Sequence, residues 1–318
     1  MGAVRSRAAL VVASVFVPVL VVAAGLVMIV TAQTGGPFDS ARLYVNPESQ
    51  AVEAVASGSA GATIERVAST PTAIWLTPEE YGPGEVGGYV RSVVADAAST
   101  GSVATFVVYG IPNRDCGNFS AGGLSASTYP TWVEEIASSL GEQKNVVLVE
   151  PDALSLAIEC EDEDVQVDAV AEAVSRLAAT SAWVYVDGGH SDWRSPTDMA
   201  ALLERVGIDG IRGFSTNVSN FNATADEMAY GEELSALVGG AHYVVDTSRN
   251  GAGSNGDWCN PSGRALGDAP LSVPRSGALD GNLWIKAPGE SDGTCNGGPP
   301  AGEWWPAAIE ELARNAGW

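Results

Sequence analysis

The chain has 318 residues, enough for one large α/β domain with a deep core or for two smaller domains. Its formal net charge of −23 would repel a phosphate backbone and no basic patch offsets it, which argues against a nucleic-acid partner. The four cysteines form no CxxC pair and the two histidines lie far apart in the chain, which argues against a structural zinc site.

The first 33 residues differ in kind from the rest. Two arginines precede an almost entirely apolar run, residues 8–30, and positive charge before such a run directs it across a membrane with its far end outside. As a helix the run would be roughly 34 Å long, enough to cross about 30 Å of hydrocarbon. We therefore expect an uncleaved anchor in residues 1–33, followed by a catalytic domain in residues 34–318. The alternative is a signal peptide cut before Gln33.

The chain then alternates between apolar runs typical of strands and segments of helical periodicity. The predicted strands are residues 72–76, 104–109, 146–149, 183–186, 211–216, 242–245 and 283–285. The predicted helices are residues 47–57, 86–97, 132–140, 167–177, 196–206, 224–238 and 305–316. Asn46 and Ser195 are the expected N-caps of two helices, and Thr224 with Glu227 is the expected capping box of another.

This alternation predicts parallel strands joined by right-handed crossovers. Polar residues follow the second through the seventh predicted strand, and only a closed or nearly closed sheet brings so many strand ends around one centre. We therefore expect a seven-stranded parallel β/α barrel, similar to a TIM barrel, rather than an open doubly wound sheet. The N-terminal apolar helix would precede it, and the active site would lie at the carboxyl ends of the strands.

Residues 145–155 form the centre of the predicted site. Residues 146–149 are apolar throughout, as expected for a strand that is buried on both faces. The strand ends at Glu150, because Pro151 has no N–H to continue a sheet ladder, and the carboxylate of Asp152 follows directly. The alternative role of Asp152 is that of an N-cap of the next helix.

Candidate site residues lie at the other strand ends as well. They are Tyr109, Asp115, Asp152, Asp187, His190, Asn217, Asn220, Lys286, Glu290 and Asp292, with Trp75, Trp193 and Trp258 in or beside the same loops. No GxSxG run follows a strand, and neither a phosphate-binding loop nor GxGxxG is present, so no cofactor is expected. Carboxylates beside aromatic rings suit hydrolysis of a sugar chain, in which an acid protonates the leaving oxygen and sugar faces stack on the rings.

Seven runs of this sequence resemble glycoside hydrolase family 6, which contains cellobiohydrolases and endo-β-1,4-glucanases. They are VVYGIPNRDCGNFSAGG (107–123), VLVEPDALS (147–155), YVDGGHSDW (185–193), TNVSNFN (216–222), DTSRNG (246–251), WCNPSGRALG (258–267) and LWIKAPGESDG (283–293). The resemblance extends from about Phe38 to the C-terminus in unbroken order. It implies a distorted seven-stranded barrel that cleaves β-1,4-glucan with inversion at the anomeric carbon.

The resemblance also implies roles for single residues. Asp152 would be the general acid and Asp292 the candidate base, while Asp115 would raise the pKa of the acid by like-charge proximity or relay a proton through water. Tyr109 would press on the distorted sugar at the cleavage point. Its neighbouring sugars would be held by Asp187, His190, Lys286 and Glu290.

The four cysteines are even in number and lie in a chain that is expected to be exported, which predicts two disulfides and no free thiol. The residues alone allow three pairings. The resemblance implies Cys116–Cys160 and Cys259–Cys295, each bracing a loop at the strand ends.

Two alternatives to an endo-acting glucanase stay open. A cellobiohydrolase would need long insertions to roof a tunnel, whereas residues 250–258 and 294–304 are short connections. A catalytically inactive glucan-binding protein at the cell surface would not need the complete set of carboxylates that this chain carries. We therefore expect a monomeric, extracellular endo-β-1,4-glucanase acting on cellulose or soluble β-glucan, secreted or held at the membrane by residues 8–30.

Overall fold

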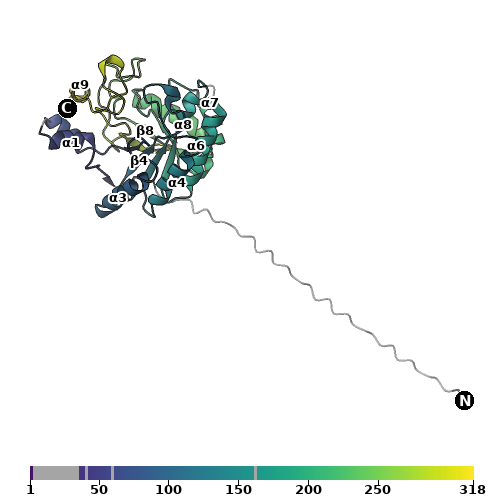
Figure 1. Ribbon diagram of the computed structural model, residues 1–318. Coiled ribbons are helices and arrows are strands. Elements are labelled where there is room, and N and C mark those ends of the chain that lie inside the picture. Colours follow the sequence, from purple (N-terminus) through teal and green to yellow (C-terminus); the bar gives the residue numbers. More distant parts are fainter. Residues whose placement is uncertain (3–35, 40–41, 59–60, 161–162) are drawn as a thin grey trace. The chain divides into compact units, whose positions relative to one another are not determined.

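Seven strands form the central sheet of the computed structural model, which describes residues 1–2, 36–39, 42–58, 61–160 and 163–318 (Figure 1). They are β2 (Ile74–Leu76), β4 (Thr105–Val108), β5 (Val146–Val149), β6 (Trp183–Asp187), β7 (Gly213–Thr216), β8 (His242–Asp246) and β9 (Leu279–Leu283). All neighbours pair in parallel, and their order in the sheet is their order in the chain. The predicted seven-stranded parallel architecture is confirmed.

The sheet curls until its edge strands, β2 and β9, approach each other at one end. Just before β2, the backbone N–H of Ala73 donates to the carbonyl of Trp284 at 2.9 Å. The indole N–H of Trp75 donates to the carbonyl of Ile285, also at 2.9 Å. No strand ladder joins these edges in the described part of the chain. The barrel is therefore incompletely closed, and the carboxyl ends of its strands converge.

Helices cover the outside of the curled sheet (Figure 1). They are α1 (Gln50–Ala56), α2 (Ala62–Ala68), α3 (Val86–Ser99), α4 (Tyr129–Ser139), α5 (Ala153–Ala157), α6 (Glu163–Ala178), α7 (Pro196–Arg205), α8 (Thr224–Leu237) and α9 (Pro306–Asn315). Contacts between neighbouring helices follow the chain order α3, α4, α6, α7, α8, as the strands beneath them do. A short parallel pair, β1 (Arg42–Leu43) with β3 (Ser102–Val103), lies outside the main sheet.

Both faces of the sheet are buried, each against a different core. Along β5, Val147 and Val149 pack in the layer between the sheet and the helices, whereas Val146 and Leu148 pack inside the barrel with Tyr185. Because neither face of this strand meets solvent, it does not need polar residues at alternate positions. This explains why the strand reads as a continuous apolar run and why it could be predicted.

The seventh strand was predicted too late in the chain. It is Leu279–Leu283 and not residues 283–285. The sequence of this strand does not look like a buried strand, because it contains the polar residues Asp280 and Asn282. Both are nevertheless buried. Asp280 accepts from the Tyr185 hydroxyl at 2.6 Å, and Asn282 donates to Thr247 Oγ1 at 2.9 Å. Hydrogen-bond partners in another strand, or just after one, allow such residues to be buried in a sheet.

Two predicted helix caps are also wrong. The first helix begins at Gln50 and is capped by Ser49, whose hydroxyl accepts from the Val52 N–H. The N-cap position of α8 belongs to Ala223 and not to Thr224, whose hydroxyl instead accepts from the side-chain amide of Asn250. Glu227 is turned to other partners. The prediction for Ser195 is confirmed, since its hydroxyl accepts from the Asp198 N–H at the start of α7.

The predicted membrane anchor and its alternative cleavage before Gln33 lie outside the described residues. Within the described ranges, no helix has the length and apolar character required to span a membrane. The division of the chain at residues 33 and 34 stays a prediction.

Candidate active site

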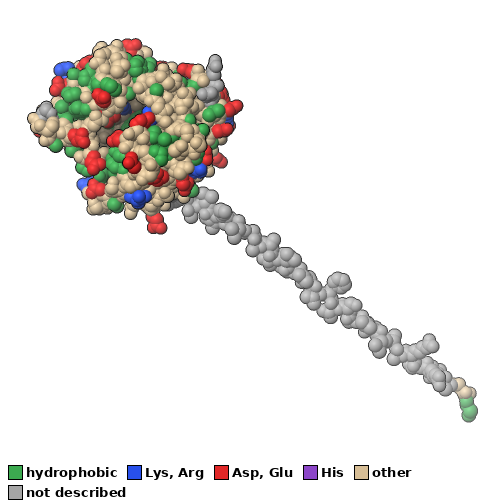
Figure 2. Space-filling view, in the orientation of Figure 1, with side chains coloured by type: hydrophobic (Ala, Val, Ile, Leu, Met, Phe, Trp, Pro, Cys, Tyr) green, Lys and Arg blue, Asp and Glu red, His purple; other side chains and the backbone are tan. Residues whose placement is uncertain are grey.

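A cavity of about 620 Å³ lies where the strand ends converge. Among the predicted residues, those that line it are Trp75, Tyr109, Asp115, Asp152, Asn220, Trp258, Lys286, Glu290 and Asp292. They come from the ends of β2, β4, β5, β7, β8 and β9. The face in Figure 2 is hollowed, and acidic side chains gather on it. The structure therefore brings these predicted residues together around one cavity, and their roles stay predictions.

Asp152 follows β5 in an unusual backbone conformation. Both Glu150 and Asp152, on either side of Pro151, have positive φ, at 49° and 67°. Positive φ costs free energy in residues other than glycine, and residues that adopt it are often found at functional sites. Asp152 holds the N-cap position of α5, but its side chain makes no capping hydrogen bond in the described part of the chain. The alternative role as a helix cap is therefore wrong, and the carboxyl group is available to the cavity.

The electrostatic surroundings of Asp152 favour its protonated form. Burial raises the pKa of its carboxyl well above the usual value, and the nearby carboxylates of Asp187, Asp115 and Asp292 raise it further. Asp187 also holds the backbone of this residue, since its Oδ2 accepts from the Asp152 N–H at 3.0 Å. A carboxylic acid with a raised pKa keeps its proton to a higher pH than an ordinary aspartate and can donate it to a leaving group.

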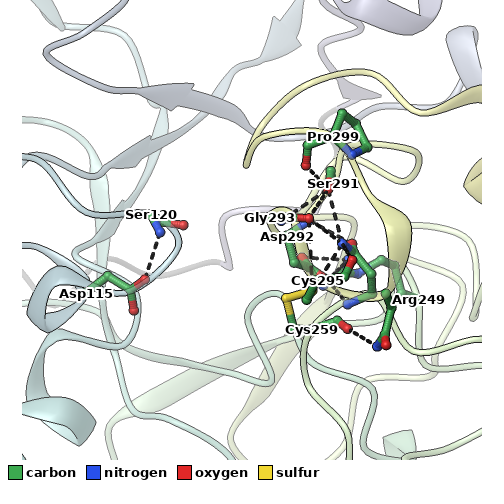
Figure 3. Close-up of a disulfide and its surroundings, with 11 residues drawn as sticks. Asp115, Ser120, Arg249, Cys259, Ser291, Asp292, Gly293, Cys295 and Pro299 are labelled. Atoms are coloured by element: carbon green, nitrogen blue, oxygen red, sulfur yellow. Dashed lines mark hydrogen bonds and ion pairs between the residues drawn. A yellow bond between two sulfur atoms is a disulfide. The ribbon is translucent and has the colours of Figure 1, made fainter.

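Asp115 also lines the cavity, in the loop after β4, the strand next to β5 in the sheet. It accepts a hydrogen bond from the Ser120 N–H at 2.9 Å, and burial raises the pKa of its carboxyl (Figure 3). The next residue, Cys116, is bonded to Cys160 beyond α5. Arg114, which sequence reasoning missed, is buried and donates to the carbonyls of Tyr109 and Ser120. The loop that carries Asp115 is thus tied at several points.

Asp292 lies against the second disulfide, Cys259–Cys295 (Figure 3). Nη1 of Arg249 donates to both of its carboxylate oxygens at 2.9 Å, and the Asn260 N–H donates to one of them at 3.0 Å. This pair is almost completely buried. Sequence reasoning missed Arg249, whose only sign was its place in the DTSRNG run. Both predicted disulfides are present, and no cysteine is free.

A smaller group of side chains surrounds the aromatic ring of Trp75. Tyr109 meets it edge-on, with ring centroids 5.1 Å apart. Lys286 lies 5.7 Å from the ring centroid and donates to Glu290 at 3.4 Å. Trp258 also lines the cavity and is 52% exposed, which leaves much of its ring accessible to a ligand.

Four predicted site residues do not line the cavity: Asp187, His190, Trp193 and Asn217. Asp187 is buried and acts through the backbone of Asp152. Asn217 is fully buried, and its amide donates to the carbonyls of Asn222 and Asp246, so its predicted contact with substrate is wrong. His190 and Trp193 lie together beside the cavity, with ring centroids 5.4 Å apart.

Glu150 is a buried carboxyl that the sequence reading treated as a strand end. It accepts from the N–H groups of Gly110 and Ile111 and from the hydroxyl of Tyr129. The two N–H groups directly follow Tyr109. Glu150 therefore connects the loop that carries Asp115 to the turn that carries Asp152.

Glu150 should make stability fall as pH rises. Burial raises its pKa to about 7 from 4.5. Because the folded pKa exceeds the unfolded one, its stabilising contribution is present below pH 4.5 and is lost as pH rises through about 7. Between about pH 5 and about pH 8 we expect the free energy of unfolding to fall by roughly 3 kcal/mol more in the wild type than in Glu150→Gln. Urea unfolding at both pH values measures this, and a difference that does not change with pH would contradict it.

No cluster of histidine, cysteine and carboxylate side chains suited to a metal ion occurs in the described residues. The cavity instead offers carboxylates, aromatic rings and hydrogen-bonding groups. This set can transfer protons to and from a sugar chain and stack on its rings.

The comparisons with known proteins agree with this chemistry. The sequence model described as "Glycosyl hydrolases family 6" matches residues 38–316. Endoglucanase A of Cellulomonas fimi is 43% identical over 287 residues, which cover 89% of this chain and 63% of that protein. Exoglucanase 3 of Agaricus bisporus is 28% identical over 351 residues, which cover 89% of this chain and 79% of that protein. The chain thus spans less than two thirds of the length of the Cellulomonas relative.

The fold has a solved counterpart. The endoglucanase Cel6 from Mycobacterium tuberculosis, in complex with methyl-cellobiosyl-4-deoxy-4-thio-β-D-cellobioside, superposes with a TM-score of 0.86 at 44% identity. The match covers 89% of this chain and all of the other.

Proposed function

The chain belongs to the glycosyl hydrolases family 6, and from that premise we propose that it hydrolyses internal β-1,4-glucosidic bonds of cellulose or soluble β-glucan with inversion at the anomeric carbon. The observation that carries this proposal is that Asp115, Asp152 and Asp292 line one cavity together with exposed aromatic rings. The ligand of the Mycobacterium structure is a thio-linked cello-oligosaccharide, which supports a glucan as substrate.

In this proposal Asp152 is the general acid that protonates the leaving glucosyl oxygen. Burial and three neighbouring carboxylates raise its pKa, so it holds its proton when the substrate binds. Asp187 fixes the turn from which it acts. After proton transfer the new carboxylate carries a charge beside other acids, which favours its reprotonation before the next turnover.

Water attack on the opposite face of the sugar needs a base. Asp292 is the candidate, although both of its oxygens already accept from Arg249. Asp115, which lines the same cavity, would relay the proton through water or support the charge of the acid. Tyr109 and Trp75 form the apolar side of the cleavage point. Lys286 and Glu290 bind neighbouring hydroxyl groups, and Trp258 stacks on a sugar ring.

Endo action is supported by the length of the connections. The alignment with the fungal exoglucanase is 351 positions long, and that with the bacterial endoglucanase is 287 positions long. Both alignments cover 89% of this chain. The extra positions are insertions in the exoglucanase, and loops of that kind can roof a cleft. Without them a long chain can enter the cleft along its length. A cellobiohydrolase is the second candidate, because the family also contains such enzymes by name.

One pair of measurements tests the proposal. On carboxymethyl cellulose, viscosity should fall steeply while few reducing ends are released, since each internal cut shortens the chain. Early proton NMR of the products should show the α-anomer first, as expected for inversion of a β-linkage. Reducing ends rising in step with viscosity loss would favour chain-end attack, and initial β-anomer would contradict inversion. No hydrolysis by a folded protein would favour an inactive glucan-binding protein.

The two disulfides fit an oxidising, extracellular location. Anchoring through residues 8–30 and a monomeric state stay predictions.

A further inference from the structure

Glu227 is a buried carboxylate outside the cavity, for which the proposed reaction has no role. It lies in the first turn of α8 and is fully buried. Glutamate is seldom buried without partners, because desolvating its charge is costly. Its Oε1 accepts from the Ser191 N–H at 3.0 Å and from the side-chain amide of Asn222 at 3.2 Å. These contacts place it beneath the loop that carries His190 and Trp193.

The contact with Glu227 decides how the side chain of Asn222 is oriented. Oε1 of Glu227 already accepts from the Ser191 N–H, so the NH₂ end of the Asn222 amide, and not its oxygen, faces it. The same NH₂ group lies 2.9 Å from Nδ1 of His190 and 3.2 Å from the hydroxyl of Ser191. The orientation that suits Glu227 therefore directs a donor at Nδ1 of His190.

Two donors converge on this ring nitrogen. Besides Asn222, the backbone N–H of Asp192 points to Nδ1 of His190 at 3.3 Å. A nitrogen that accepts hydrogen bonds carries no proton, so the neutral ring has its proton on Nε2. Burial lowers the pKa of His190 to about 4, which keeps the ring neutral near pH 7. His190 thus offers one fixed donor, Nε2–H, beside the ring of Trp193.

We propose that Glu227 is a positioning residue, which sets the tautomer of His190 through Asn222 and so fixes an Nε2–H donor beside the cavity, for a hydroxyl group of a glucan that extends out of it. The part that concerns the glucan rests on the proposed function. The part that concerns the tautomer does not.

Nitrogen-15 NMR of the histidine rings tests the tautomer without substrate. The chain has two histidines, and a His242→Gln variant assigns the signals. In the wild type near pH 7 we expect a single Nε2–H tautomer for His190. In Glu227→Ala the Asn222 amide loses the partner that orients it, and only the longer contact from the Asp192 N–H, at 3.3 Å, still favours an unprotonated Nδ1. We therefore expect some Nδ1–H tautomer beside the Nε2–H form. Glu227→Gln keeps one acceptor oxygen and should restore most of the wild-type spectrum. Glu233→Ala, an exposed change on the same helix, is the matched control.

Two results would overturn the assignment of the tautomer. One is an Nδ1–H tautomer in the wild type, which needs no variant to fold. The other is an unchanged spectrum in folded Glu227→Ala. For the glucan, we expect Glu227→Ala to raise KM for soluble cello-oligosaccharides roughly fivefold to tenfold, with a smaller change in kcat, as for one lost hydrogen bond. A mixed tautomer with unchanged KM would overturn the role in glucan binding. A wild type that cleaves no glucan would refute the proposed function, while the NMR result would still stand.

Discussion

Asp152→Ala is expected to lower the cleavage of unactivated glucan by about 10²–10⁴-fold, the usual contribution of a general acid. The same variant should hydrolyse a dinitrophenyl cellobioside at a rate much closer to that of the wild type. The dinitrophenolate leaves as a stable anion and needs no proton. Parallel rate measurements on the two substrates test the prediction directly.

The pH profile adds a second reading of the same variant. An acid must be protonated to act, so the wild-type rate on glucan should fall as pH rises through the raised pKa of Asp152. On the activated substrate the Ala variant should lack this fall at high pH. Glu233→Ala, an exposed change on α8, is the control and should leave both profiles nearly unchanged.

Equal losses on both substrates, in a variant shown to be folded, would reject Asp152 as the acid and direct attention to Asp115 or Asp292. Loss of a helix cap is not expected to confuse the result. The side chain of Asp152 makes no capping hydrogen bond within the described residues, so its removal should not carry the usual cost of a lost cap, about 0.5–2 kcal/mol.

Arg249→Met is expected to lower the free energy of unfolding by about 3–5 kcal/mol. The side chains of Arg249 and Asp292 are 4% and 8% exposed. Removing the arginine leaves a buried carboxylate without its counter-charge, and the carbonyl of Ser219 also loses a donor. Urea unfolding near neutral pH measures the loss.

Two further variants show whether the loss comes from the uncompensated charge. The double variant Arg249→Met with Asp292→Asn should recover much of the stability, because no charge is then left buried. Arg275→Met removes the exposed pair with Asp39, in which both side chains are 45% exposed, and should cost less than about 1 kcal/mol. If the two arginine variants lower the free energy of unfolding by the same amount, the burial of the Arg249–Asp292 pair does not make its loss more costly.

The sequence predicted the structure correctly where interactions between residues close together in the chain decide it. The strand at Val146–Val149 was predicted to the residue, because an apolar run buried on both faces and stopped by a proline is unambiguous. The cap at Ser195 is confirmed for the same reason, since its partner lies three residues away. The strand Leu279–Leu283 was misplaced because Asp280 and Asn282 are satisfied by partners 95 and 35 residues away in the chain.

The sequence by itself determined the order of strands and helices and the chemical types of side chain at the strand ends. These depend on periodicity, turn residues and charge, which can be read within about ten residues. The tertiary structure alone decided which side chains share the cavity, that Asn217 is buried, and that Asp292 is held by Arg249. It also decided that Glu150 and Glu227 are internal acceptors. Burial and pairing between distant segments set these outcomes, and neither is visible until the sheet curls and its ends converge.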